Sequence, residues 1–377
     1  MKYIFVTSTI ELEKLLSQQG DLHYFVFQDL DFSTFPSVRK QFHNCLFLGC
    51  NIPHVLHHYF KNCIVFPALK YPFNPYRAQL YSNRELYQGY ELGKLGSYKQ
   101  TLDYKIFKHF KKYIEAPNRV TFAQTEEADY LEILARRLHD NSISQAIAEF
   151  IKKYDEKKVV AIMGGHQLKR NTIEYKNIVY LSKQLTEQNY LMVSGGGPGA
   201  MEATHLGAWM AGCTNQQTDE AIDILAQVNL FSEKGWLDQA FKVIERFPKP
   251  KFESLGIPTW LYGHEPPTPF ATQIGKFFAN SVREDGLLAI AKGGVIYTPG
   301  SAGTFQEIFQ DITQNHYTSF DFPSPMIFMG TKYWTEEVPI YNLIKDFADK
   351  GILKNMLLSV FDQTDQIIQE LNEFSSH

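Results

Sequence analysis

Residues 190–203 read Tyr-Leu-Met-Val-Ser-Gly-Gly-Gly-Pro-Gly-Ala-Met-Glu-Ala, and this stretch decides the fold of the chain. The apolar run at 190–194 predicts a buried strand, and a helix is expected to open at Ala200. The residues between them carry almost no side-chain bulk, so backbone N–H groups and the positive end of the helix dipole face an incoming ligand. A strand-turn-helix unit of this kind is expected to bind a phosphate group.

Two further glycine-rich turns follow predicted strands, at 159–163 and at 294–298. The first is compatible equally with a nucleotide-binding turn and with a tight strand-to-helix corner. The candidate phosphate-binding residues of the three turns are Gly164, Gly165, Gly195, Gly196, Gly197, Gly199, Gly300, Ser301, Ala302, Gly303 and Thr304. The sequence matches neither G-x-G-x-x-G nor G-x-x-x-x-G-K-[ST], which disfavours ATP hydrolysis.

Strands and helices alternate through residues 156–377, with further strands predicted at 258–262, 325–329 and 357–361. This alternation predicts a Rossmann-like, doubly wound parallel α/β sheet that helices cover on both faces. The stretch 213–256 interrupts the rhythm and reads as a helical insertion. The aromatic side chains of Phe305 and Phe309 are expected in a buried helical stripe.

Residues 1–115 are expected to form a smaller accessory domain, and 116–155 a helical connector to the domain at 156–377. A pattern of apolar-x-x-apolar-x-apolar starts at Phe27, Phe47 and Phe66, which suggests repeat-like stacked strands. Chance spacing in a segment rich in phenylalanine is the alternative. In the connector, two apolar stripes meet at Asn141 and Ser142, which are expected to cap a second helix.

The composition excludes several classes of protein. The 37 Lys and Arg residues nearly balance 41 Asp and Glu residues, so no nucleic-acid partner is expected. No apolar run approaches the ~18 residues of a membrane span, and with four cysteines a cytoplasmic location is expected. The His and Cys residues between 43 and 63 include no C-x-x-C pair, so no metal is expected there.

Residues 299–307, Pro-Gly-Ser-Ala-Gly-Thr-Phe-Gln-Glu, resemble the P-G-G-x-G-T-x-x-E signature of the LONELY GUY (LOG) family, once mislabelled as lysine decarboxylases. The turn at 195–203 resembles that family's other glycine-rich loop, which ends in a Met-containing helix start and so adds Met201 to the site. The resemblance covers residues 156–330 and is closest to the larger bacterial branch that includes nucleotide 5′-monophosphate nucleosidases. It implies a homodimer that hydrolyses the N-glycosidic bond of a nucleoside 5′-monophosphate to free base and ribose 5-phosphate.

The resemblance also implies the catalytic residues. Glu307 matches the signature glutamate, whose carboxylate would stabilise positive charge on the ribose or orient the attacking water. The alternative is structural, because Thr304-x-x-Glu307 has the spacing of a capping box. Arg283 is the nearest match to the family's catalytic arginine, although the neighbouring His and Lys of the family are absent. Glu284 either positions Arg283 or belongs to a solvated helix face. The scheme requires no metal and no cofactor.

Other residues near predicted strand ends are candidates for contact with the base. Tyr262 and His264 follow a predicted strand, where ligands bind in doubly wound sheets, and His264 would protonate the base or be an ordinary loop histidine. Trp260 and Phe270 are expected to bracket the mouth of the site. Glu202, at the start of a helix, is expected to be structural. The alternative to an enzyme is a non-catalytic nucleotide-binding regulatory protein, and a carrier of a larger phosphorylated cofactor is a third reading.

Overall fold

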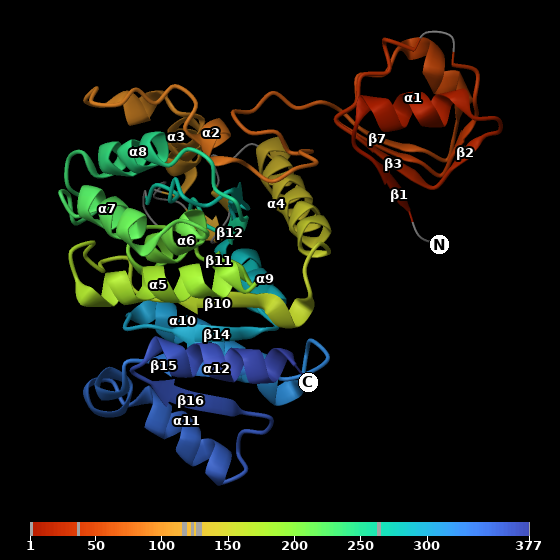
Figure 1. Ribbon diagram of the computed structural model, residues 1–377. Helices are drawn as coiled ribbons and strands as arrows, with labels where there is room; N and C mark the ends of the chain where they lie inside the picture. The colour runs from red at the N-terminus through yellow and green to blue at the C-terminus, as the bar shows by residue number, and fades with distance from the viewer. Residues whose placement is uncertain are drawn as a thin grey trace. The chain divides into compact units, whose positions relative to one another are not determined.

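The computed structural model describes residues 3–35, 38–114, 119–121, 124–125, 130–261 and 265–376. The chain divides into two compact units, one comprising Met1–Leu80 with Lys111–Ala146 and the other Tyr81–Phe110 with Ile147–His377 (Figure 1). Residues 81–110, which the sequence analysis grouped with the N-terminal domain, therefore lie in the same unit as the glycine turns. Among the described residues, no helix combines the length and the apolar character needed to cross a membrane.

The N-terminal segment of the first unit is a short stack of parallel strands. One sheet contains β1 (Ile4–Val6), β3 (Phe25–Gln28), β5 (Leu46–Leu48) and β7 (Ile64–Phe66), and a second contains β2 (Leu22–His23), β4 (Phe42–His43) and β6 (Phe60–Lys61). Helix α1 (Thr9–Ser17) precedes β2. Strands β3, β5 and β7 each contain the first phenylalanine of a predicted segment, so the regular spacing in the sequence corresponds to stacked coils.

Aromatic rings fill the centre of this stack. Phe27 and Phe47 are fully buried with their ring centroids 5.0 Å apart, and Phe47 stacks in turn on Phe60 at 4.4 Å. Burial raises the pKa of the Cys45 and Cys50 thiols to about 11. The two thiols therefore pack as small apolar groups among the rings.

The second unit contains a seven-stranded sheet in which every pair of neighbours is parallel. Its strands are β10 (Val159–Met163), β11 (Leu191–Ser194), β12 (Ser254–Gly256), β13 (Gln273–Ile274), β14 (Gly294–Tyr297), β15 (Pro325–Met329) and β16 (Leu357–Phe361), in the order β13-β12-β11-β10-β14-β15-β16. The predicted parallel α/β fold class is confirmed. Because the chain leaves β10 in one direction and β14 in the other, the strand order reverses between these two strands.

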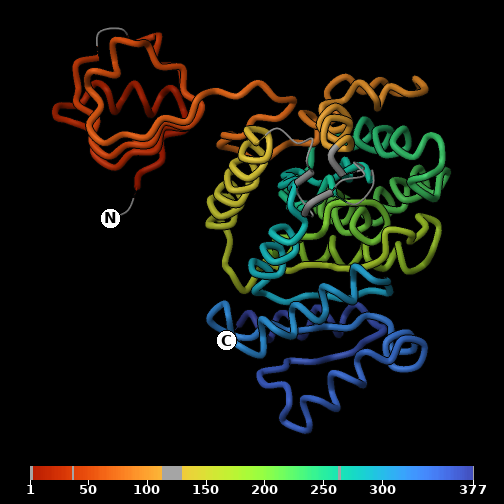
Figure 2. The backbone as a smooth tube through the Cα atoms, turned by 180° about the vertical axis from the view of Figure 1, so that it is seen from behind, coloured from red at the N-terminus to blue at the C-terminus, as the bar shows by residue number. Residues whose placement is uncertain are grey.

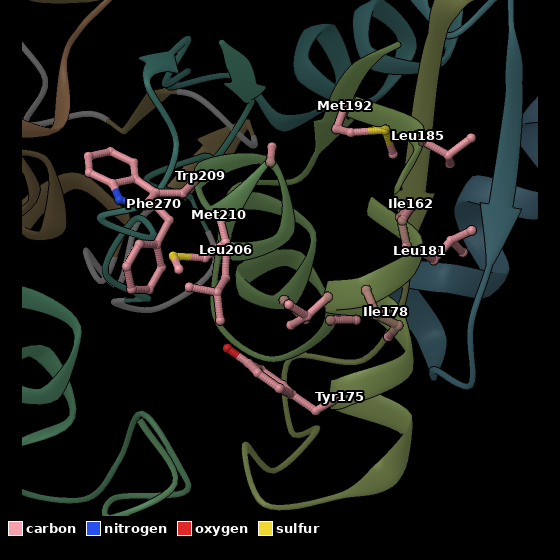
Figure 3. Packing of buried hydrophobic residues seen from close by; sticks show 14 of the residues in the cluster. Ile162, Tyr175, Ile178, Leu181, Leu185, Met192, Leu206, Trp209, Met210 and Phe270 are labelled. Carbon is pink, nitrogen blue, oxygen red and sulfur yellow. The ribbon is translucent and has the colours of Figure 1, made fainter. Parts of the chain in front are cut away.

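Helices cover both faces of this sheet (Figures 1 and 2). Helices α5 (Ile173–Glu187), α6 (Ala200–Met210) and α12 (Thr364–Ser375) share one buried apolar cluster with the central strands. Figure 3 shows the part of this cluster that α5, α6 and the strands contribute. Helices α9 (Asn280–Ile290) and α10 (Ala302–Tyr317) pack against each other on the other face. The remaining helices are α2 (Asn83–Leu86), α3 (Leu102–Ile114), α4 (Tyr130–Ile151), α7 (Asn215–Leu225), α8 (Trp236–Arg246) and α11 (Ile340–Asp349), and a short hairpin joins β8 (Arg119–Thr121) to β9 (Gln124–Thr125).

Three sequence-based expectations about local structure are wrong. The strand predicted at 258–262 instead occupies Ser254–Gly256, since Pro258 lacks the N–H that a central strand needs. The two helices predicted in the connector are one continuous helix, α4, and the Ser142 hydroxyl donates to the Pro75 carbonyl (2.9 Å) in place of capping a second helix. Phe309 is 47% exposed on α10, whereas the neighbouring Ile308 is fully buried.

Ile308 and Phe309 provide a matched pair for testing the orientation of α10. Replacing Ile308 with alanine leaves a cavity in a closed core and should lower the free energy of unfolding by about 2–5 kcal/mol. Replacing the larger but half-exposed Phe309 with alanine should cost less than about 1 kcal/mol. Urea denaturation followed by tryptophan fluorescence measures both, and a larger loss for Phe309→Ala than for Ile308→Ala would contradict this orientation.

Candidate active site

The three glycine turns meet at the carboxyl edge of the sheet. The turns after β10 and β14 flank the point where the strand order reverses, and the turn after β11 lies beside them. Open α/β sheets bind their ligands at this position. A cleft of about 390 Å³ opens there, and of the predicted site residues it is lined by Gly164, Gly165, Gly195, Gly197, Met201, Arg283, Glu284, Ser301, Ala302, Gly303, Thr304 and Glu307.

Three predicted glycines support the turns beside the cleft and are not part of its lining. Gly199 has a φ of +69°, and a Cβ atom there would lie only 2.4 Å from the Gly165 carbonyl oxygen. The first and second glycine turns thus touch backbone to backbone, which only glycine permits. The carbonyl of Gly196 accepts a hydrogen bond from the Thr268 N–H (2.7 Å), and that of Gly300 accepts one from the Tyr333 hydroxyl.

Helices α6 and α10 begin at the cleft without help from side chains. Their N-cap residues are Gly199 and Ser301, and neither makes a side-chain capping bond in the described part of the chain. The first-turn N–H groups of a helix have no partner within the helix itself. Because Ala302, Gly303 and Thr304 all line the cleft, the start of α10 offers N–H groups and a positive dipole end to an anion.

Arg283 lies between two carboxylates in the cleft. Its Nη2 atom is 3.0 Å from Glu284 Oε1, and its Nη1 atom is 3.5 Å from Glu307 Oε1. Its Nε–H also donates to the Asn280 side-chain oxygen at 3.0 Å, and Gln306 donates to the other oxygen of Glu284. Glu284 is buried and contacts Arg283, so the reading as a solvated helix face is wrong.

Glu307 does not form the capping box that its spacing allowed. Helix α10 begins at Ala302, which places Thr304 inside the helix and directs Glu307 toward Arg283. Its side chain is only 12% exposed. Burial raises the pKa of Glu307 to about 7, with the Glu284 charge acting in the same direction and Arg283 opposing both. A carboxyl group that gains and loses its proton near neutral pH is suited to acid-base or charge-stabilising chemistry.

A buried hydrogen-bond chain supports the central glycine turn. Ser194, the last residue of β11, accepts from the Gly196 N–H (3.0 Å) through its hydroxyl, which also bonds to His205 Nε2 at 2.9 Å. His205 Nδ1 bonds in turn to the Ser254 hydroxyl on β12, also at 2.9 Å. Burial lowers the pKa of His205 to about 3. This neutral imidazole therefore ties α6 to two strands and leaves the turn rigid.

Glu202 has the structural role that the sequence suggested. Its carboxylate pairs with Arg170 at 2.5 Å and accepts from the Tyr175 hydroxyl at 2.9 Å, and all three side chains are buried. Arg170 also donates to the carbonyls of Val228 and Trp236. A single buried guanidinium therefore fastens the segment that carries α7 and α8 to the helix that follows the central glycine turn.

Among the cleft residues that the sequence did not nominate, two carry titratable side chains. His166 follows the first glycine turn, and Glu265 lies between β12 and β13. Their side chains approach to 3.8 Å between His166 Nδ1 and Glu265 Oε1. The two residues are about a hundred positions apart in the sequence, and only the folded chain brings them together. The signal that was present is the position of Glu265 after a strand end.

Two aromatic residues expected at the mouth are core residues. Trp260 is fully buried, packs against Phe278 at 4.7 Å between ring centroids, and donates through Nε1 to Asp103 at 3.0 Å. Phe270 is fully buried in the cluster beneath α6. Neither lines the cleft, so the expectation for both is wrong. Tyr262 and His264, the two predicted base-contacting residues, lie outside the residues that the structure describes.

Comparison with known proteins assigns no family to the chain. No protein-family model matches the sequence, and no curated protein matches it. Among solved structures, the chain is similar to the molybdenum cofactor binding protein from the phototrophic bacterium Rippkaea orientalis, at 13% identity and a TM-score of 0.35. That match covers 57% of this chain and 95% of the other, and similarity this low carries no argument about function. Among the described residues, no group of three or more His, Cys, Asp or Glu side chains is arranged to hold a metal ion.

A buried carboxyl on α10, that of Asp311, should make the protein less stable as the pH rises. Burial raises the pKa of Asp311 to about 7, and its only described partner in the hydrogen-bond network is the Tyr297 hydroxyl at 2.7 Å. In the unfolded chain this carboxyl loses its proton near pH ~4, so between about pH 4 and about pH 7 the folded state binds more protons. The free energy of unfolding therefore falls across that range, by up to about 1.4 kcal/mol per pH unit for each such group.

Asp311→Asn isolates this effect. The variant should flatten the fall in stability between about pH 5 and about pH 7 relative to the wild type. Urea denaturation at several pH values in that window measures the difference between the two proteins. Parallel profiles for wild type and variant would show that Asp311 does not retain its proton in the folded state.

Proposed function

We propose that this protein is a phosphoribohydrolase, which cleaves the N-glycosidic bond of a nucleoside 5′-monophosphate to free base and ribose 5-phosphate. The observation that carries the proposal is the Arg283–Glu307 pair, buried in a cleft that is also lined by the glycine turns and by the start of α10. The resemblance of residues 299–307 to the LOG signature supports the same assignment.

The cleft suits both ends of such a substrate. The 5′-phosphate would bind the first-turn N–H groups of α10 and the glycine turns, where fixed dipoles favour a dianion without a metal. Arg283 would hold the ribose or the phosphate through its planar donors, and Glu284 and Asn280 fix the orientation of that guanidinium. The sugar would then lie against Glu307.

Glu307 would act on the bond that breaks. As the C1′–N bond breaks, its electron pair leaves with the base and positive charge develops on the ribose ring. An ionised Glu307 stabilises that charge and accepts a proton from the water whose oxygen bonds to C1′. Since the pKa of Glu307 is about 7, the ionised fraction increases through neutral pH. The rate of a reaction that needs the carboxylate should increase over the same range.

Glu307→Gln tests the proposal with minimal change in shape. Wild-type protein should release base from at least one of AMP, GMP, CMP or UMP, and the variant should release it at least about 100-fold more slowly. Its melting temperature should not decrease, because the substitution removes a buried charge. Liquid chromatography of the products measures the rate, and Glu174→Gln, an exposed carboxylate on α5, is the matched control.

Two results would contradict the proposal. Unchanged base release by Glu307→Gln would remove Glu307 from the chemistry. A wild-type protein that binds a nucleoside monophosphate and leaves it intact would favour the alternative function, a nucleotide-binding regulatory protein.

A further inference from the structure

Glu265 and Arg283 approach the same glycine turn from different parts of the chain. A Cβ atom on Gly195 would lie 3.4 Å from Arg283 Nη1, and a Cβ atom on Gly197 would lie 3.3 Å from Glu265 Oε2. These two glycines are separated by one residue, and the Met201 side chain lies close to both. The cleft therefore holds a third carboxylate, Glu265, a short distance along the turn from the Arg283–Glu307 pair.

The loop that carries Glu265 is held in place on its C-terminal side. Tyr87 donates its hydroxyl proton to the Pro267 carbonyl, and the Thr268 N–H donates to the Gly196 carbonyl at 2.7 Å. Further along, the fully buried Lys276 pairs with Asp103 of α3 at 2.7 Å. Residues 81–110 thus secure the loop against the central glycine turn. A carboxyl group held in this way has the fixed position that proton transfer requires.

We propose that Glu265, with His166 as its neighbour in the cleft, is the general acid that protonates the departing base. This inference rests on the proposed hydrolysis of a nucleoside monophosphate. It adds the proton donor that the departing base needs in that reaction. A purine or pyrimidine leaves poorly as an anion, so a proton delivered to a ring nitrogen lowers the barrier. The proton moves from Glu265 to the base while the C1′–N electron pair goes to the base, and the attacking water gives a proton to Glu307. Exchange with solvent then restores both carboxyls.

The charges around Glu265 are compatible with this role. Burial raises the pKa of Glu265, while His166, Lys276 and Arg283 each act to lower it. His166 comes from the turn after β10, Lys276 from the segment after β13, and Arg283 from α9. The Glu265–His166 pair places a carboxyl group and an imidazole 3.8 Å apart in the lining of the cleft.

Two substrates that differ only in the leaving group test the assignment. AMP needs its base protonated, whereas 4-nitrophenyl β-D-ribofuranoside 5-phosphate releases a nitrophenolate that departs as an anion. Glu265→Gln should slow adenine release by about 100-fold or more and change nitrophenol release by less than about threefold. His166→Gln should reduce adenine release selectively as well, by a smaller factor. Glu174→Gln, on the exposed face of α5, should alter neither rate.

The outcomes separate this inference from the proposed function. Retained nitrophenol release by Glu265→Gln proves that the variant is folded and competent, and the selective loss with AMP then supports the general acid. Equal losses on both substrates, or no loss on AMP, would overturn it. If Glu265→Gln does not fold, the ratio measured for His166→Gln decides, and an unselective effect there overturns the inference. A wild type that releases no base from any nucleoside monophosphate would instead overturn the proposed function.

Discussion

One arginine shared between two buried carboxylates is the interaction on which the cleft depends. Arg283 pairs with Glu284 and lies 3.5 Å from Glu307, so two negative charges compete for one positive charge away from bulk water. Burying charges costs free energy that a single cation does not fully offset. The remaining cost appears in the raised pKa of Glu307, which retains its proton to about pH 7. The start of α10, which lines the cleft, provides positive potential that further favours an anion there.

The sheet and its glycine turns could be predicted because they depend on local pattern. Apolar runs of strand length, separated by helical stripes, locate five strands of the second unit, and runs of glycine mark where strands turn into helices. The failures have local causes. The strand predicted at 258–262 includes Pro258, which a central strand does not accommodate. The apolar stripe that contains Phe309 does not indicate which side of α10 the rest of the protein covers. Burial of Phe309 is a tertiary property that periodicity alone does not determine.

The candidate site could be predicted only where one segment contains both the residue and its context. Glu307 lies on the helix that its own glycine turn begins, so a short motif was enough to identify it. The position of Glu265 depends on contacts that its loop makes with two distant segments. One is with Gly196, about seventy residues earlier in the chain, and the other is with residues 81–110, which the sequence predicted to belong to another domain. No periodicity links these segments. Arg283 lies between these two cases. Its motif is incomplete in the sequence, and only the fold shows that it pairs with Glu307.

The aromatic residues of the chain serve mainly to build its cores. In the first unit, rings such as Phe27 and Phe47 fill coils too narrow for a layered core, and each ring contacts those of neighbouring coils. In the second unit, Trp260 and Trp334 are fully buried, and each donates its indole N–H to a protein oxygen. The polar atom of each indole therefore has a hydrogen-bond partner in the core. Trp260 is joined through Asp103 to Lys276, the same ion pair that secures the Glu265 loop. A residue expected to stack on the substrate therefore acts on the cleft indirectly, by fixing the position of a loop that lines it.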